Sequence, residues 1–278
     1  MTFGGAGGFE CPFCGSKAFM SDADFKQNEE FRKSLLQYYK AEAIKKDNDY
    51  SQDSIFTCRG HDSYTLETGE ALFIDYMIKR AYDGYVCYLA KESVIYVFEE
   101  PAAAQTFMHG LRSLRFPDAD TKLQRSVPEL KLTLQLQSGA YVLVFVRHPN
   151  FYPAELFAPW VSDQLAWVIS RMENICCLLQ YSEIEHGCIT PDAIWINPLT
   201  HEGALFGDWR KVRSLRGVND LAALRRTAIA LASDTRKPKE LYDFLNHAPM
   251  PDAFRDFELW DKVIESGFGG HKFIKMDV

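Results

Sequence analysis

The chain has 278 residues, of which 47% are hydrophobic and 25% charged, and this composition is ordinary for a globular protein of one large or two modest domains. Its net charge of -7 argues against a protein that binds nucleic acid over its whole surface. No apolar run approaches the roughly 20 residues of a membrane helix, and the N-terminus lacks the basic and apolar regions of a signal peptide, so we expect a cytosolic protein. The seven cysteines are an odd number and several lie in apolar segments, which indicates a reducing compartment and not a disulfide framework.

Two short motifs near the N-terminus predict a metal site. Cys11-Pro-Phe-Cys14-Gly is a knuckle that can turn two thiolates towards one ion, and Cys58-Arg-Gly-His61 repeats its spacing. Together they predict a closed, tetrahedral and therefore structural Zn²⁺ site, and they resemble a zinc ribbon with an expanded middle. The alternative is a redox CxxC motif, which needs a thioredoxin-like strand-to-helix pattern that does not follow here.

The segment between the two knuckles predicts a helix over residues 24–46. Its basic residues are balanced by acidic ones, so we interpret the charged side as a solvated face. We expect the zinc ribbon and this helical insert to occupy residues 1–66.

Residues 67–150 predict a small domain made mainly of strands. Two runs of β-branched and aromatic residues, 85–90 and 94–99, predict a hairpin. A helix over 102–114 follows Pro101, which suits a first helical position. A second hairpin is expected from the strands 130–136 and 140–146, and the sequence RHPNFYP then predicts a hinge.

Residues 151–278 predict a mainly helical domain around a short loop. Apolar residues at three-and-four spacing predict a buried helix over 162–181. A loop over 186–191 leads to two apolar strands, 193–197 and 204–206, and Asp208 follows them. Three further helices are expected, one starting at Asn219 and the others over 240–246 and 254–265.

This order of helix, loop, hairpin and acidic residue resembles the catalytic region of the protein-kinase-like superfamily, where an HRDxKPxN loop precedes a DFG motif. On the loop motif, the resemblance places His186 on the His, Gly187 on the Arg, Cys188 on the Asp, Thr190 on the Lys, Pro191 on the Pro and Ala193 on the Asn. It places Asp208, Trp209 and Arg210 on DFG, and Asp220 on the helix Asp that bonds the loop backbone. The resemblance implies an α+β fold: a zinc ribbon with a helical insert, followed by a minimal two-lobed kinase-like domain with a small lobe over 67–150 and a reduced large lobe over 151–278.

Most groups that phosphoryl transfer needs are missing from these positions. Cys188 replaces the carboxylate base, and Ala193 replaces a ligand of Mg²⁺. Lys91 is expected in a turn, the helix that follows it has no acidic residue, and the segment ETGEALF has a single Gly where a Gly-rich loop is needed. The resemblance thus implies a pseudokinase that is not an enzyme and for which ATP binding is not expected. We expect it to bind a protein partner as a scaffold, inhibitor or regulator, and its overall arrangement is similar to that of proteins encoded by bacteriophages.

Other readings of these residues remain open. We interpret His186 as structural and Cys188 as an inert thiol, although a Cys188 nucleophile assisted by His186 is the alternative. Asp208 is the residue with the clearest functional position. It also carries a competing hypothesis, an atypical metal-dependent phosphotransferase or nucleotidyl transferase that uses Asp208 together with His186 or Asp192.

A local basic cluster gives a third hypothesis. It consists of Arg210, Lys211, Arg213 and Arg216. The cluster predicts either a solvated loop or a surface for an acidic partner, phosphate or nucleic acid. Together with the zinc ribbon, this cluster gives the hypothesis that the protein is a nucleic-acid-associated regulator.

Overall fold

The computed structural model describes residues 49–117, 123–233 and 237–272, together with three short strands near the N-terminus. These strands, β1 (Thr2–Gly4), β2 (Gly8–Glu10) and β3 (Lys17–Phe19), form an antiparallel sheet in the order β1-β2-β3. They belong to one compact unit, and a second unit starts at Tyr50. Cys11, Cys14 and the helix predicted over 24–46 lie outside the described residues.

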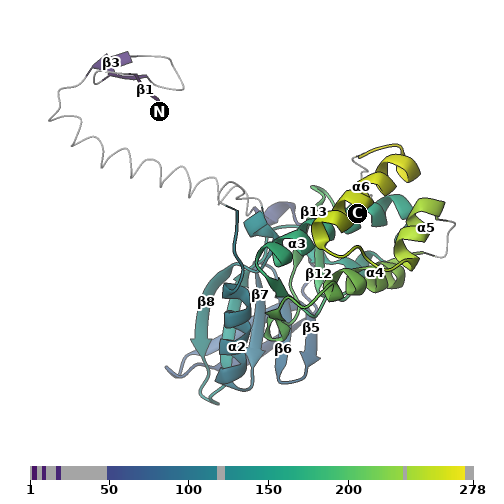
Figure 1. Ribbon diagram of the computed structural model, residues 1–278. Coiled ribbons are helices and arrows are strands. Elements are labelled where there is room, and N and C mark those ends of the chain that lie inside the picture. Colours follow the sequence, from purple (N-terminus) through teal and green to yellow (C-terminus); the bar gives the residue numbers. More distant parts are fainter. Residues whose placement is uncertain are drawn as a thin grey trace. The chain divides into compact units, whose positions relative to one another are not determined.

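The small lobe is built on one six-stranded antiparallel sheet with the order β4-β5-β6-β7-β9-β8 (Figure 1). The strands are β4 (Gly60–Thr65), β5 (Ala71–Tyr82), β6 (Tyr85–Ala90), β7 (Ser93–Phe98), β8 (Leu130–Gln135) and β9 (Tyr141–Val146). The sequence predicts the β6-β7 and β8-β9 hairpins but not β4 or β5, because both of these strands carry many polar, exposed residues. Since β4 is part of this sheet, the boundary predicted at residue 66 falls inside the second unit.

The sheet curls until its two edges meet. Leu66, directly after β4, forms an antiparallel bridge with Leu136, directly after β8. On either side of this bridge, the N–H of Glu67 donates to the Gln135 carbonyl and that of Gln137 to the Thr65 carbonyl, both at 2.9 Å. The curl buries a separate apolar cluster that consists of Ile74, Tyr88, Ile95, Val97, Leu136, Val142 and Val144. The small lobe therefore has a core on each face of its sheet.

Helix α2 (Pro101–Arg112) covers the other face of the sheet, starts at the predicted Pro101, and contacts the large lobe. Its Phe107 is fully buried against Tyr96 of β7 and Phe145 of β9. A Cβ on Gly110 would come 2.1 Å from the Trp209 carbonyl oxygen, so only glycine allows α2 to approach the short 3-10 helix η4 (Trp209–Lys211) this closely.

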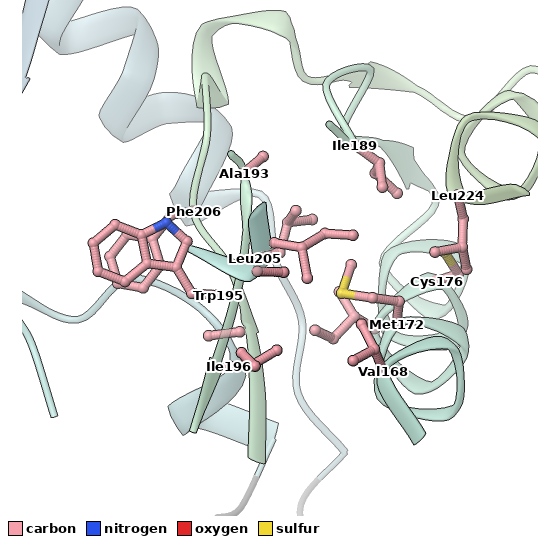
Figure 2. Packing of buried hydrophobic residues seen from close by; sticks show 14 of the residues in the cluster. Val168, Met172, Cys176, Ile189, Ala193, Trp195, Ile196, Leu205, Phe206 and Leu224 are labelled. Carbon is pink, nitrogen blue, oxygen red and sulfur yellow. The ribbon is translucent and has the colours of Figure 1, made fainter. Parts of the chain in front are cut away.

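The large lobe is organised around α3 (Ser162–Tyr181), whose bounds are those predicted from the sequence. One face of this helix packs on a three-stranded sheet in the order β10-β12-β13, made of β10 (Tyr152–Pro153), β12 (Ile194–Asn197) and β13 (Glu202–Leu205). Figure 2 shows Val168 and Met172 on the side of α3 that faces Ile196 and Leu205, all of them buried. This packing fixes the position of the β12-β13 hairpin relative to α3.

The remaining elements complete this lobe and its connections. They are β11 (Ile184–Glu185), β14 (Arg213–Ser214), α4 (Asn219–Leu231), α5 (Lys239–Asn246), α6 (Ala253–Phe268) and the 3-10 helices η1 (Tyr50–Gln52), η2 (Leu123–Ser126) and η3 (Ala154–Phe157). A buried ion pair of 2.7 Å between Arg225 and Asp256 links α4 to α6. Across the ranges that the structure describes, no helix combines the length and the apolar character needed to cross a bilayer.

Candidate functional site

Asp220, near the start of α4, binds the backbone of the loop over 186–191 through hydrogen bonds. One carboxylate oxygen accepts the N–H of His186 at 2.6 Å and the other accepts the N–H of Gly187 at 2.9 Å. Gly187 has a φ of 72°, a left-handed conformation that glycine adopts without strain. The Asp220 carboxylate, in the first turn of α4, thus fixes the backbone at the start of the loop.

His186 is a packing residue in this arrangement. Its ring is fully buried and meets the ring of Trp209 edge to face, with the centroids 4.6 Å apart. Burial lowers the pKa of His186 to about 4, against a weaker opposing effect of the Asp208 charge. The imidazole is therefore neutral at physiological pH, and it connects the loop to η4.

Asp208 lies after β13 and is almost completely buried. Two N–H groups of the Arg210 guanidinium donate to its two carboxylate oxygens, Nε to Oδ1 and Nη2 to Oδ2, each at 2.9 Å. The same guanidinium lies 4.8 Å from the ring centroid of Tyr85 in β6 and donates to the carbonyl of Asp83. Arg210 therefore compensates the negative charge of Asp208 and also contacts the small lobe.

Aromatic side chains connect α2 to the strand that precedes it. In kinases, a Lys on the strand before the lobe's helix pairs with a Glu of that helix. Here β7 precedes α2, and Tyr96 and Phe98 of β7 both pack on Phe107 of α2, with ring centroids 4.9 and 5.5 Å apart. The Tyr96 hydroxyl donates to the Gly207 carbonyl at 3.4 Å, next to Asp208. Lys91 lies in the exposed β6-β7 turn.

The two lobes are joined by polar contacts across the cleft between them. The hydroxyl of Tyr82, at the end of β5, donates to Asp192, directly after the loop, at 2.5 Å. Arg80 pairs with Glu155 and lies 4.0 Å from Asp192. Burial by itself would raise the pKa of Asp192, but hydrogen bonds from Thr190 and Tyr82 and the charge of Arg80 lower it. The charged form of this carboxylate is thus favoured by Thr190 and by two side chains of the other lobe.

The space left in this cleft is small. The cavity there has a volume of about 20 Å³ and is lined by side chains of β5, β6 and β7 on one side and by Asp192, Trp195 and Gly207 on the other. Ligand pockets usually measure about 300–1,000 Å³. The β5-β6 turn over this space contains Asp83 and Gly84, whereas the segment ETGEALF, considered from the sequence as the Gly-rich loop, lies in the β4-β5 hairpin.

The hinge between the lobes contains a buried ion pair that the sequence did not indicate. The side chains of Arg147 and Asp53 are both fully buried, with Nη2 and Oδ2 2.6 Å apart. The Nε of Arg147 donates to the Lys91 carbonyl at 2.9 Å, and the Tyr152 hydroxyl donates to Asp53 at 2.5 Å. The segment before β4 is thus anchored on the hinge. No local motif signals such a pair, because its two members are 94 residues apart.

The other predicted site residues have these positions. Cys188 is half-buried in the loop and Ala193 is fully buried, its Cβ close to Gly207. Cys58 is exposed just before β4, and His61 is exposed within β4. Within the described ranges, no three His, Cys, Asp or Glu side chains gather closely enough to hold a metal ion.

The basic cluster is partly used inside the protein. Arg213 donates to Glu185 at 2.8 Å, and this carboxylate is almost completely buried. Glu185 also accepts the backbone N–H of Arg216 and the side-chain amide of Asn219. With Arg210 on Asp208, two of the four basic side chains serve internal carboxylates, while Lys211 and Arg216 are exposed.

Comparison with models of known protein families gives no match, and no curated protein matches the sequence. Solved structures do match. The kinase domain of BubR1 has a TM-score of 0.55 and 11% identity, over 85% of this chain and 93% of that one. The ROP18 kinase domain in complex with AMP-PNP and sucrose has a TM-score of 0.51 and 13% identity, over 81% of this chain and 92% of that one.

A structure of WbdD with a kinase inhibitor matches 72% of this chain with a TM-score of 0.48 and 12% identity. This chain spans 47% of that one, about half its length. The comparisons contradict the prediction that the protein is not an enzyme, because its fold is shared with kinase domains, one of them solved with AMP-PNP. The described part of this chain has a protein-kinase-like fold.

Proposed function

We propose that this protein is a kinase-like domain whose cleft is closed by its own side chains, and that it acts by binding a protein partner as a scaffold or regulator. One observation carries the proposal: the Arg210 guanidinium pairs with both oxygens of Asp208. In kinases the equivalent carboxylate holds Mg²⁺. A carboxylate that is already paired with a guanidinium gains less from a metal ion, because its charge is compensated.

The rest of the cleft supports the same proposal. The Tyr96–Phe107 pair offers no charge to a phosphate, and the 20 Å³ cavity has no room for a nucleotide while Tyr82 and Arg80 bridge the lobes. We therefore propose that ATP is not bound in the usual way in this arrangement.

A thermal-shift series tests the nucleotide part of the proposal. ATP and GTP, each with Mg²⁺ or Mn²⁺, should leave the melting temperature of the full chain unchanged. A metal-dependent rise that Asp208→Ala abolishes would contradict it. For the partner, affinity capture from the native cell should yield a protein that also binds the purified chain directly, and recovery of no direct binder would contradict the binding role.

A second candidate is a metal-dependent phosphotransferase or nucleotidyl transferase. The observation that favours it is the place of Asp208, which follows β13 at the cleft in a fold shared with kinase domains. Such an activity requires Arg210 to leave Asp208 so that the carboxylate can bind a metal ion. Nucleotide consumption that requires Mg²⁺ or Mn²⁺ and is lost in Asp208→Ala would establish it.

We also propose a structural Zn²⁺ bound by Cys11, Cys14, Cys58 and His61. The exposed positions of Cys58 and His61 leave both side chains accessible to a metal ion. Thiolate and imidazole are the ligands that structural zinc prefers. Metal analysis should find one zinc per chain, and Cys58→Ser should lower this content while Cys177→Ser, on α3, should not. A wild-type chain without zinc would contradict the site.

A further inference from the structure

The Asp53 carboxylate contacts the hinge at three places. It accepts the Tyr152 hydroxyl at 2.5 Å, a guanidinium N–H of Arg147 at 2.6 Å and the backbone N–H of Asn150 at 3.3 Å. Arg147 directly follows strand β9 of the small lobe, whereas Tyr152 begins strand β10 of the large lobe. A single carboxylate therefore binds both ends of the segment that connects the lobes.

The Arg147 guanidinium adds further contacts at the same point. Its Nε donates to the Lys91 carbonyl in the β6-β7 turn at 2.9 Å, and its Nη1 donates to the Phe151 carbonyl at 3.3 Å. It also lies 5.7 Å from the ring centroid of Tyr50 and 5.5 Å from that of Phe56. Because this guanidinium is fully buried, the loss of its carboxylate partner leaves a buried charge uncompensated.

We call residues 50–56 the strap, because this segment binds the hinge at several points. It starts with η1, and the Tyr50 hydroxyl donates to the Arg147 carbonyl. Ile55 and Phe56 are partly buried against the main apolar core. The second compact unit also begins at Tyr50, directly after the unit formed by residues 1–49. The covalent connection between the two units therefore runs through contacts on the hinge.

The strap opposes rotation of one lobe relative to the other. Such a rotation requires the hinge backbone to change its dihedral angles. With the strap in place, Arg147 and Tyr152 would have to separate from the carboxylate that binds them both. The cleft is closed by polar contacts of β5 with Asp192 and Glu155. When the hinge is fixed, these contacts form between groups that are already close together, which lowers their entropic cost.

We propose that the strap holds the hinge in one conformation and that the cleft opens only when Asp53 leaves Arg147 and Tyr152. A partner that displaces the strap thereby controls access to the cleft. The inference rests on the closed cleft of the proposed function. Its test measures opening of the lobes and not the binding of a nucleotide or a partner, so the two proposals can fail separately.

The first test follows the labelling of Cys87, which lines the cleft cavity, by a thiol reagent in the full chain. Asp53→Asn keeps the shape of the side chain but removes its charge, and we expect several-fold faster labelling than in the wild type. Asp256→Asn is the matched control, because it removes the carboxylate of another buried ion pair, that of Arg225 within the large lobe. Labelling through complete unfolding is corrected for by urea denaturation of each protein. Equal corrected rates in the two variants would overturn the proposal.

A milder variant keeps every charge in place and does not depend on the folding of Asp53→Asn. Tyr50→Phe removes only the hydroxyl that binds the Arg147 carbonyl, and it should speed labelling of the cleft thiol by a smaller factor. Tyr64→Phe removes a hydroxyl that is bonded to Tyr88 between β4 and β6, and it should leave the rate unchanged. A Tyr50→Phe rate equal to that of the wild type would also overturn the proposal.

A third measurement uses only the wild-type chain. Hydrogen exchange of the Asn150 amide reports release of the strap, because this N–H donates to Asp53. The opening constant obtained from Cys87 labelling should not exceed the one obtained from Asn150 exchange, since the lobes separate only after the strap has left. A larger opening constant for Cys87 would show that the cleft opens with the strap in place, and the inference would then be wrong.

Discussion

Arg210 holds both carboxylate oxygens of Asp208, two residues before it in the chain, through two hydrogen bonds of 2.9 Å. The guanidinium also lies over the rings of Tyr85 and Phe98 in the small lobe, at 4.8 and 5.9 Å from their centroids. One side chain thus neutralises the buried acid and joins the two lobes.

Replacing Arg210 should destabilise the fold. Arg210→Ala leaves the Asp208 carboxylate, 8% exposed, without its cation, and we expect a loss of about 1–3 kcal/mol in the free energy of unfolding. Urea denaturation measures this loss. Arg226→Ala, at an exposed position of α4, should change the same quantity by less than about 0.5 kcal/mol. Equal effects of the two substitutions would show that the Arg210–Asp208 pair contributes nothing to stability.

Removing the Asp220 carboxylate should loosen the loop. Asp220→Ala leaves the N–H groups of His186 and Gly187 without their acceptor, and we expect a loss of about 2–4 kcal/mol. Asp220→Asn keeps one acceptor oxygen and should lose less. Amide hydrogen exchange of His186 and Gly187 should be fastest in the Ala variant. Unchanged exchange there would mean that other contacts hold the loop.

Glu173 should make the stability depend on pH. Burial, assisted by the nearby Asp256 charge and opposed by Arg225, raises the pKa of Glu173 from 4.5 to about 9. Between these two values the unfolded chain loses the proton and the folded chain keeps it, so the Glu173 contribution to stability falls as pH rises. The slope is at most about 1.4 kcal/mol per pH unit.

Glu173→Gln should remove this slope because the amide does not titrate. Urea unfolding at a series of pH values between about 5 and 8 compares the two proteins. Glu258→Gln, at an exposed position of α6, is the matched control and should keep the wild-type slope. If the Glu173→Gln slope equals that of the wild type, Glu173 is already charged in the folded protein.

Breaking the contacts between the lobes should open the cleft. Tyr82→Phe combined with Arg80→Gln removes the bonds to Asp192 and Glu155. The Cys87 thiol lines the cleft cavity, and burial raises its pKa to about 12, so it should react slowly with a thiol reagent in the wild type.

Peptide mapping by mass spectrometry can follow the labelling of Cys87. We expect it to be several-fold faster in the double variant than in the wild type. Tyr242→Phe removes a hydroxyl from an exposed position of α5 and should leave the rate unchanged. Equal rates in all three proteins would show that these bonds do not control access to the cleft.

Local sequence was sufficient for several elements. The spacing of apolar residues in 162–181 predicts α3 with its exact bounds, and Pro101 marks the start of α2. Strands β6, β7, β8 and β9 are predicted because apolar and β-branched residues are concentrated in them. The exposed and mixed pattern of β5 gave no such signal, and without β5 the position of the turn over the cleft could not be inferred.

What the sequence by itself determined is the order of helix, loop, hairpin and acid from which the kinase-like fold was predicted, because these elements follow from patterns within short stretches of chain. Only the tertiary structure decided which groups occupy the cleft and the hinge. Tyr96 meets Phe107, Tyr82 reaches Asp192 and Arg147 meets Asp53 through contacts between residues 11 to 110 positions apart. Such contacts depend on how the sheet curls and how the lobes pack, which no local pattern encodes.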